Sequence, residues 1–288
     1  MIQWDLSHVK KIKNKDTTKV LIKNSVPVIE YQHKEMPEWV INGFSTRVGG
    51  VSEGIYEEMN LSFTQGDDEA KVRENFHIFG KALGVEVSDM IYSHQTHTTN
   101  VMRVTRDEKG MGILRERNFS HIDGLITNEP GVCLVTSYAD CVPLYFVDVK
   151  NKAIGLSHSG WRGTVGNICQ NTISLMEKEF HSKPEDILGF IGPSICQDCY
   201  EVSGDVAELF MEAYCDEQAR DMLISKGDGK YLLDLHKANY YNMQNCGLKE
   251  ENILMPDLCT CCNDAWLHSH RASCGKRGGL CAFLCIEK

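Results

Sequence analysis

The sequence predicts an α/β (or α+β) fold: a single-domain layered sandwich in which a mixed β-sheet is covered by helices. Three observations predict it. Short apolar runs at 132–138, 144–148 and 153–157 alternate with turn residues, as strands do. Segments 70–83 and 165–180 carry apolar residues every three to four positions, as amphipathic helices do. Strands interspersed with helices indicate a sheet with helices packed on its faces.

The individual elements follow in chain order. The first helix is expected at 70–83, where Val72, Phe76, Phe79 and Leu83 recur at helical spacing. The strands at 144–148 and 153–157 are joined by the polar turn 149–152. The next helix is expected to start near Val165 and to end before Pro184. A strand at 187–191 and a helix at 206–214 complete the prediction.

Composition and charge exclude several classes of protein. The chain of 288 residues is 42% hydrophobic and 24% charged, which is ordinary for a globular protein. Its 30 Lys and Arg against 40 Asp and Glu give a net charge of −10, so no basic surplus exists for general nucleic-acid binding. The N-terminal segment has no apolar run long enough for a signal-peptide core, and no apolar stretch approaches the length of a membrane span. We therefore expect a cytoplasmic protein with no membrane or nucleic-acid partner.

The 13 cysteines are unusual. Glutathione keeps cytoplasmic thiols reduced and the number is odd, so a complete disulfide framework does not explain them. The cysteines are therefore expected to be buried apolar residues, metal ligands or nucleophiles.

One candidate site combines histidines with a cysteine. His94 and His97, Cys141, and His158 each lie just beyond an apolar strand-like run, where α/β sheets commonly place ligands. Two imidazoles and a thiolate suit a three-ligand zinc site with an open fourth position, and their softness also allows copper. The spacings of 44 and 17 residues match no fixed metal motif. A Cys–His nucleophile pair and unrelated packing residues remain alternatives.

A second candidate consists only of cysteines. Cys196 and Cys199, and Cys259 and Cys262, form two pairs that together suit a tetrahedral structural zinc site. However, 59 residues separate the pairs, far more than in a zinc ribbon. The spacing therefore favours reduced cysteines that pack in a core or line a pocket.

Arginines beside glycines or in short polar motifs form a third set. Arg47, Arg162 and Arg271 offer planar guanidinium groups that bind phosphate or carboxylate through two hydrogen bonds, and neighbouring glycines let a ligand approach the backbone. Surface ion pairs with the excess acidic residues are the alternative. Gly163, just ahead of the predicted helix, would also direct backbone N–H groups toward an anion.

Several segments, in their order along the chain, resemble one family. Ala139-Asp140-Cys141 and His158-Ser159-Gly160-Trp161-Arg162-Gly163 are its most specific elements. The chain resembles the laccase-domain family, first called multicopper polyphenol oxidases and later described as purine nucleoside phosphorylases that also deaminate adenosine. The match implies a domain over residues 40–288, with 1–39 as an N-terminal extension packed on it. The other matching segments are 43–52, 59–62, 66–68, 74–75, 95–97, 123–127, 192–195, 199–202 and 269–272.

The resemblance also implies site residues. The metal ligands, which are also the catalytic residues, would be His97, Cys141 and His158. His97 is preferred to His94 because Gln95-Thr96-His97 aligns with the family's Gln-x-His. One departure is that the family's closing Gly-Arg pair is replaced here by Lys276-Arg277-Gly278-Gly279. The substrate-binding positions would be Arg47, Asn60, Arg162 and Arg271.

The implied function is a zinc-dependent purine nucleoside phosphorylase with adenosine deaminase activity. It would cleave adenosine, inosine or methylthioadenosine with phosphate to the base and the sugar 1-phosphate. One alternative is a metal-free hydrolase acting on a peptidoglycan precursor, with Cys141 as nucleophile and His158 as base. A copper-dependent polyphenol oxidase fits less well, because a multicopper site needs more paired histidines than these 11 scattered ones supply. A non-enzymatic metal-binding protein is also compatible with the residues.

Overall fold

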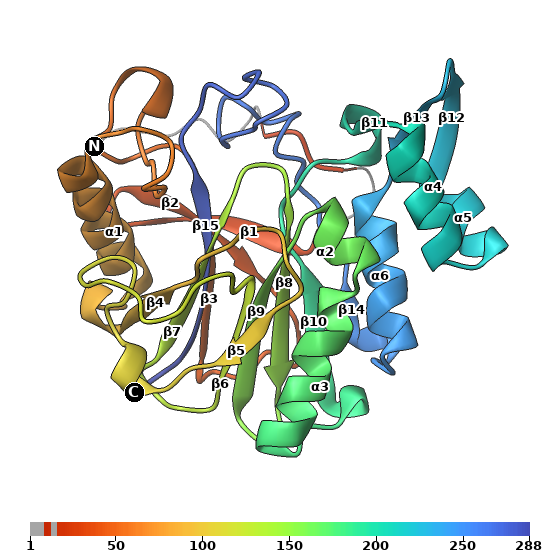
Figure 1. Cartoon of the computed structure of the whole chain (residues 1–288). Helices are drawn as coiled ribbons and strands as arrows, with labels where there is room; N and C mark the ends of the chain where they lie inside the picture. The colour runs from red at the N-terminus through yellow and green to blue at the C-terminus, as the bar shows by residue number, and fades with distance from the viewer. Residues whose placement is uncertain (1–8, 13–15) are drawn as a thin grey trace.

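The computed structural model describes residues 9–12 and 16–288, and its frame is a pair of six-stranded mixed sheets (Figure 1). The first sheet has the order β1 (Thr18–Lys23), β2 (Val26–Tyr31), β3 (Val40–Ser45), β15 (Leu280–Ile286), β7 (Cys133–Tyr138) and β4 (Met90–Tyr92). The second has the order β14 (Ile253–Leu254), β10 (Ile187–Ile191), β8 (Val142–Asp148), β9 (Ala153–Ser159), β6 (Gly124–Thr127) and β5 (Val101–Arg103). Parallel pairing occurs at β4–β7, β5–β6 and β10–β14.

The two sheets pack face to face, and their central strands are buried on both sides. In β15, Leu284 belongs to the core between the sheets, whereas Phe283 faces the core on the other side of the first sheet. In β8, Tyr145 faces the core between the sheets and Phe146 the outer core of the second. Strands buried on both faces have continuous apolar sequences, because alternate side chains enter different cores.

Helices cover the two outer faces. Helix α1 (Glu69–Leu83) packs on the first sheet through Phe76 and Phe79, while α3 (Ile168–Phe180) and α6 (Leu235–Asn245) pack on the second (Figure 1). These layers confirm the predicted α/β sandwich, with two mixed sheets where the sequence indicated one. The remaining named elements near α6 are α4 (Gly204–Ala213), α5 (Asp216–Met222) and the three-stranded sheet of β11 (Glu201–Ser203), β13 (Lys230–Leu233) and β12 (Leu223–Gly227).

The helix predicted from Val165 differs from the observed one. A short helix α2 (Trp161–Val165) comes first, and α3 begins only at Ile168. Asn167 separates α2 from α3 because its backbone adopts the left-handed conformation, with φ 55°. Its side chain caps the start of α3 by accepting the Gln170 N–H. Gly163 consequently lies buried inside α2, so the prediction that it comes just ahead of the helix is wrong.

The described part of the predicted N-terminal extension contributes to the first sheet. Strands β1 and β2 pair antiparallel with each other, and β2 pairs with β3. Residues 1–8 and 13–15 of that extension lie outside the described residues. The division into an extension and a domain at residue 40 stays a prediction.

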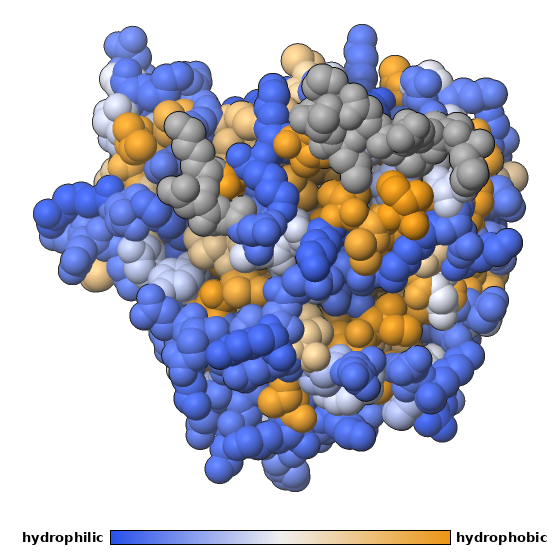
Figure 2. Space-filling view, turned by 180° about the vertical axis from the view of Figure 1, so that it is seen from behind, coloured by the Kyte–Doolittle hydropathy of each residue, from blue (hydrophilic) through white to orange (hydrophobic). Residues whose placement is uncertain are grey.

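The surface opposite to the view of Figure 1 shows apolar residues in small groups among hydrophilic ones (Figure 2). Among the described residues, no helix has both the length and the apolar character that crossing a membrane requires.

Candidate metal centre and active site

Two imidazoles and a thiol converge at one edge of the second sheet. The β8–β9 pairing sets Pro143 opposite His158, so Cys141, directly before β8, lies beside the end of β9. His97 comes from the loop between β4 and β5, and its Nε2 lies 4.0 Å from the Cys141 Sγ. The ligand atoms of His97, Cys141 and His158 all lie within 4.8 Å of one another. The structure thus brings together the three residues predicted as metal ligands.

A buried carboxylate, Asp123, orients both histidines. Its Oδ1 lies 2.8 Å from His158 Nδ1 and accepts the His97 backbone N–H at 3.0 Å. Its Oδ2 accepts the backbone N–H groups of Thr96 and Thr98. Burial alone would raise the pKa of Asp123, but the hydrogen bond and charge of His158, with the backbone N–H donors, lower this pKa to about 2. The ionised carboxylate keeps the His158 proton on Nδ1, so Nε2 is left to act as a ligand or base.

Cys141 and His158 form a polarised pair. Burial opposes the thiolate, but the charge and hydrogen bonds of His158 and His97 lower the pKa of Cys141 to about 6. Burial likewise opposes the imidazolium, but Cys141 and Asp123 raise the pKa of His158 to about 9. Either a metal ion or a proton on His158 can therefore balance a thiolate at this position.

The donor set fits a metal ion of the zinc type. One sulfur and two imidazole nitrogens are ligands that zinc takes in catalytic sites, and three protein ligands leave a coordination position free. Asp123 supplies the carboxylate behind the imidazole that such sites commonly have. Gly160 lets the ligands approach, because a Cβ there would lie 3.0 Å from His97 Cδ2 and 3.1 Å from Cys141 Sγ. The geometry supports a metal site without identifying the metal.

The cluster borders an open cavity of about 240 Å³, which is slightly smaller than most ligand sites. The residues that line this cavity include three aromatic rings, Phe63, Tyr92 and Tyr138. Three histidines of the described chain line it as well: His94, His97 and His158. Phe63, His94 and Arg117 also line a neighbouring hollow of about 580 Å³. The site can therefore receive a small molecule with a flat ring.

Two arginines line this cavity, Arg117 and Arg277. The Arg277 Nε is buried without a hydrogen-bond partner, and its Nη1 donates only to the adjacent Gly278 carbonyl at 2.9 Å. Burial lowers the pKa of Arg277, which reflects a guanidinium only partly compensated by its surroundings. Arg117 donates from Nε to the Tyr92 carbonyl and lies over the Tyr92 ring. Together they make the cavity suitable for an anion.

The predicted substrate-binding residues occupy other places. Asn60 is fully buried, and its Oδ1 accepts the backbone N–H groups of Ser62 and Gly279. Arg47 donates to the Glu57 and Asp264 carbonyls and lines a smaller cavity that Arg277 also borders.

Arg162 is exposed and lies 4.1 Å from the Trp161 ring centroid. Arg271 donates from its side chain to the Glu201 carbonyl and from its backbone to Asp140 Oδ2. None of these four residues is among those lining the cavity of the cluster in the described chain. Their substrate-binding role stays a prediction.

Sequence reasoning missed Asp123, Arg117 and Arg277 as site residues. Asp123 directly precedes the apolar run of β6, whereas the candidate residues His94 and Cys141 were recognised because they follow such runs. Arg277 appeared only as a departure from the family pattern. Arg117 lies in a loop without any local signal, and only the fold places it at the cavity.

Comparisons with known proteins identify relatives over most of the chain. The family described as multi-copper polyphenol oxidoreductase laccase matches residues 41–287. The purine nucleoside phosphorylase YlmD of Geobacillus stearothermophilus is 32% identical over 248 residues, covering 85% of this chain and 89% of that protein. The adenosine deaminase RL5 of an unknown prokaryotic organism is 31% identical, covering 80% and 88%.

The crystal structure of Bacillus licheniformis hypothetical protein YfiH superposes with a TM-score of 0.85 at 28% identity, covering 96% of this chain and 99% of that one. The names of the two enzymes support an enzymatic function with a small-molecule substrate for this chain as well. The chain belongs to the multi-copper polyphenol oxidoreductase laccase family.

Proposed function

We propose that this protein is a zinc-dependent purine nucleoside phosphorylase that also deaminates adenosine. The observation that carries the proposal is that a cluster of two imidazoles and a thiol shares one cavity with the incompletely paired guanidinium of Arg277. The names of relatives at about 30% identity support the same two activities. The chemistry needs both a site for a purine and a site for phosphate.

In this proposal His97, Cys141 and His158 hold the zinc ion. Zinc supplies Lewis acidity and acidifies water at neutral pH. Asp123 orients His158 through its Nδ1 and holds the backbone of His97, so both imidazoles present their Nε2 atoms to the same point. The exposed position of His97 leaves the cluster accessible from the cavity.

Phosphorolysis would use the arginines and the aromatic lining. Phe63 and Tyr92 offer flat surfaces for the purine, while Arg277 and Arg117 bind phosphate. A phosphate oxygen attacks C1′ of the ribose, and the C1′–N9 bond breaks with its electron pair leaving on the purine. The products are ribose 1-phosphate and the free base. Arg277 holds the attacking anion where positive charge develops on the sugar.

The leaving purine needs a proton, and we assign this to His94. Of the three histidines in the described part of the chain that line the cavity, His94 lies outside the metal cluster. Its Nδ1 accepts the backbone N–H of His121 at 3.2 Å, so Nε2 carries the proton in the neutral ring. For deamination, the same side chain would protonate the departing ammonia after water adds at C6.

A metal-free cysteine hydrolase is the second candidate, and one observation favours it. Asp123, His158 and Cys141 form a carboxylate–imidazole–thiol series, with the imidazole oriented as in a catalytic triad. The Cys141 thiolate would attack the acyl carbon of an amide, the C–N bond would break as protonated His158 gives its proton to the leaving amine, and water would then hydrolyse the thioester and release the thiol. In this reading the convergence of His97 has no required role, and for that reason we place the metal-dependent function first.

The deciding experiment measures products in protein of known metal content. We expect zinc-loaded protein to release adenine from adenosine and hypoxanthine from inosine only with phosphate, in step with ribose 1-phosphate, and to release ammonia from adenosine without phosphate. Methylthioadenosine is tested alongside. Cys141→Ser should abolish all of these activities, whereas Cys274→Ser, at an exposed cysteine, should retain them.

Other results would contradict the proposal. Full activity after removal of metal would exclude the zinc mechanism. Base release that does not need phosphate would replace phosphorolysis by hydrolysis. An absence of purine chemistry, together with Cys141-dependent cleavage of an amide in a peptidoglycan precursor, would support the second candidate.

A further inference from the structure

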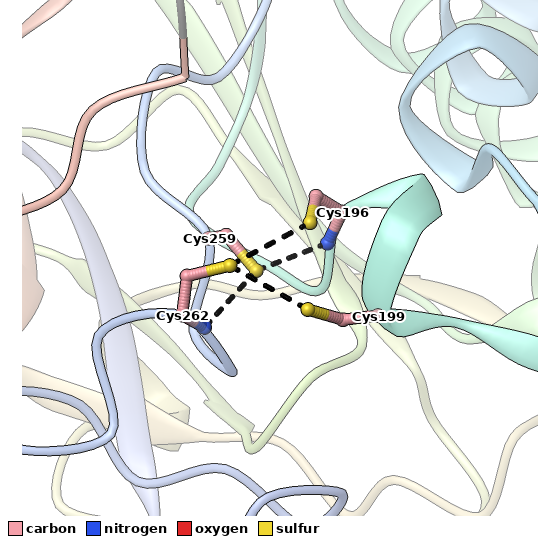
Figure 3. A group of neighbouring side chains, drawn as sticks. All are labelled: Cys196, Cys199, Cys259 and Cys262. Atoms are coloured by element: carbon pink, nitrogen blue, oxygen red, sulfur yellow. Dashed lines mark hydrogen bonds between the residues drawn. The ribbon is translucent and has the colours of Figure 1, made fainter.

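We propose that Cys196, Cys199, Cys259 and Cys262 bind a second zinc ion, in a structural site separate from the His97–Cys141–His158 cluster. The four side chains point toward one another (Figure 3). Their Sγ atoms all lie within 4.8 Å of one another. The long separation in sequence favours unrelated packing, but the structure instead forms a four-thiol cluster.

The fold explains how the two distant pairs meet. β10 and β14 pair in parallel, with Gly189 opposite Ile253. The two segments that follow these strands continue side by side. Ser194 forms a parallel bridge with Cys259, and the Ser194 carbonyl accepts the Thr260 N–H at 3.1 Å. Each segment then turns, and its second cysteine, Cys199 or Cys262, joins the same cluster. Adjacent parallel segments thus replace the short loop of a zinc ribbon.

The sulfur separations match one shared metal ion. With a Zn–S bond of about 2.3 Å, a tetrahedral site requires neighbouring sulfurs about 3.8 Å apart. The Sγ of Cys262 lies 3.5 Å from that of Cys199 and 3.9 Å from that of Cys196. A disulfide requires about 2.05 Å, and all four cysteines are free. The geometry is therefore that of metal ligands, with no pair bonded.

Two backbone N–H groups point at one of the sulfurs. Cys196 and Cys262 donate to the Cys259 Sγ at 3.2 and 3.4 Å. Such donors stabilise a thiolate and offset the negative charge of a zinc ion bound by four sulfurs.

Three of the four cysteines of this cluster are less buried than the cysteines that only pack. Cys133, Cys169 and Cys281 are fully buried among apolar residues of the cores. Cys259 is buried as well, but Cys196, Cys199 and Cys262 are only partly buried, so complete burial in an apolar core does not account for the approach of these three.

The four-cysteine site would stabilise the backbone that leads into Cys141 of the catalytic cluster. Asp140, directly before Cys141, has φ 88° and is held from both cysteine-bearing segments. Its carbonyl accepts the Ile195 N–H at 3.0 Å, and its Oδ1 accepts the Thr260 hydroxyl at 2.6 Å. Four protein ligands leave no open coordination position, so the role is structural. Each thiol loses a proton when zinc binds, and these protons pass to solvent.

The test counts metal ions in the full-length protein. We expect two zinc ions per chain in the wild type by elemental analysis, one in Cys141→Ser and one in Cys262→Ser. Cys274→Ser, at an exposed cysteine outside both clusters, should keep two. In Cys141→Ser loaded with cobalt, the remaining ion should show the intense thiolate charge-transfer and visible bands of a tetrahedral four-sulfur site.

This measurement does not depend on nucleoside chemistry, and the Cys141→Ser background keeps it informative if Cys262→Ser fails to fold. The proposal is overturned if Cys141→Ser retains no metal, if it holds iron in place of zinc, or if its cobalt spectrum lacks the four-sulfur bands. Thiol titration of the denatured protein without reductant would also overturn it by showing fewer than the 13 thiols of the sequence, since disulfides would then explain the cluster.

Discussion

The Oδ1 of Asp123 lies 2.8 Å from Nδ1 of His158 and also accepts the backbone N–H of His97 at 3.0 Å. One buried carboxylate therefore positions two of the three candidate ligands, which come from a loop and a strand far apart in sequence. This arrangement lets the cluster keep its shape although His97 is exposed.

Replacing Asp123 by Asn should weaken zinc binding. The amide keeps the size of the side chain but removes the charge that orients His158, so we expect the affinity for zinc to fall about 10- to 100-fold. Competition with a chelator gives the dissociation constant. Asp148→Asn is the matched control, because Asp148 is also fully buried and accepts two backbone N–H groups, but at the other end of β8. Equal affinities in the two variants would refute the positioning role.

Replacing Arg277 by Met should impair phosphate use. Loss of a charge-assisted hydrogen bond costs about 1.5–3 kcal/mol, so the KM for phosphate should rise about 10- to 100-fold. Ammonia release from adenosine, which needs no phosphate, should change much less. Arg220→Met, on the exposed surface of α5, serves as the control. If the KM for phosphate instead rises only in Arg47, Arg162 or Arg271 variants, phosphate binds where the sequence motifs predict.

Replacing Gly160 by Ala should displace the ligands with little effect on the fold. Its φ of −71° suits alanine, but the added Cβ would crowd both His97 and Cys141. We expect weaker zinc binding and a free energy of unfolding of the metal-free protein within about 1 kcal/mol of the wild type. Gly204→Ala is the control, since its Cβ would lie 3.3 Å from the Gly229 carbonyl, away from the cluster. Unchanged zinc affinity in Gly160→Ala would contradict the close approach.

His268 should make stability fall in acid. Burial, with the charges of Arg47 and Arg277, lowers the pKa of His268 from 6.5 to about 3. Below about pH 6.5 His268 of the unfolded chain binds a proton, whereas His268 of the folded chain stays neutral down to about pH 3. The free energy of unfolding therefore decreases as the pH falls from about 6.5 to about 3.

The contribution is about 2 kcal/mol between about pH 7 and about pH 5. Urea unfolding of the wild type and of His268→Gln should therefore diverge in pH dependence, with the shallower slope in the variant. His77→Gln, on the exposed face of α1, should keep the slope of the wild type. Parallel curves for wild type and His268→Gln would show that His268 does not contribute.

The sequence by itself determined the elements and the order of the chemical groups. Residues 132–138 and 153–157 read as strands because alternate side chains enter two apolar cores, and α1 follows from its helical spacing. The positions of His97, Cys141 and His158 just beyond or at the end of strand-like runs made them candidates, and the family resemblance implied that they are metal ligands. The sequence did not predict local backbone geometry. At Asn167, for example, a residue in the left-handed conformation divides one predicted helix into two.

The tertiary structure alone decided which groups share a site. Parallel pairing of β10 with β14 brings Cys196 and Cys259 together across a long separation in sequence. Packing likewise places Arg277 at the cavity while Arg162 lies exposed beside Trp161, although the sequence singled out Arg162 and not Arg277 as a binding residue. The physical reason is that pairing and burial depend on long-range contacts, which no local spacing encodes.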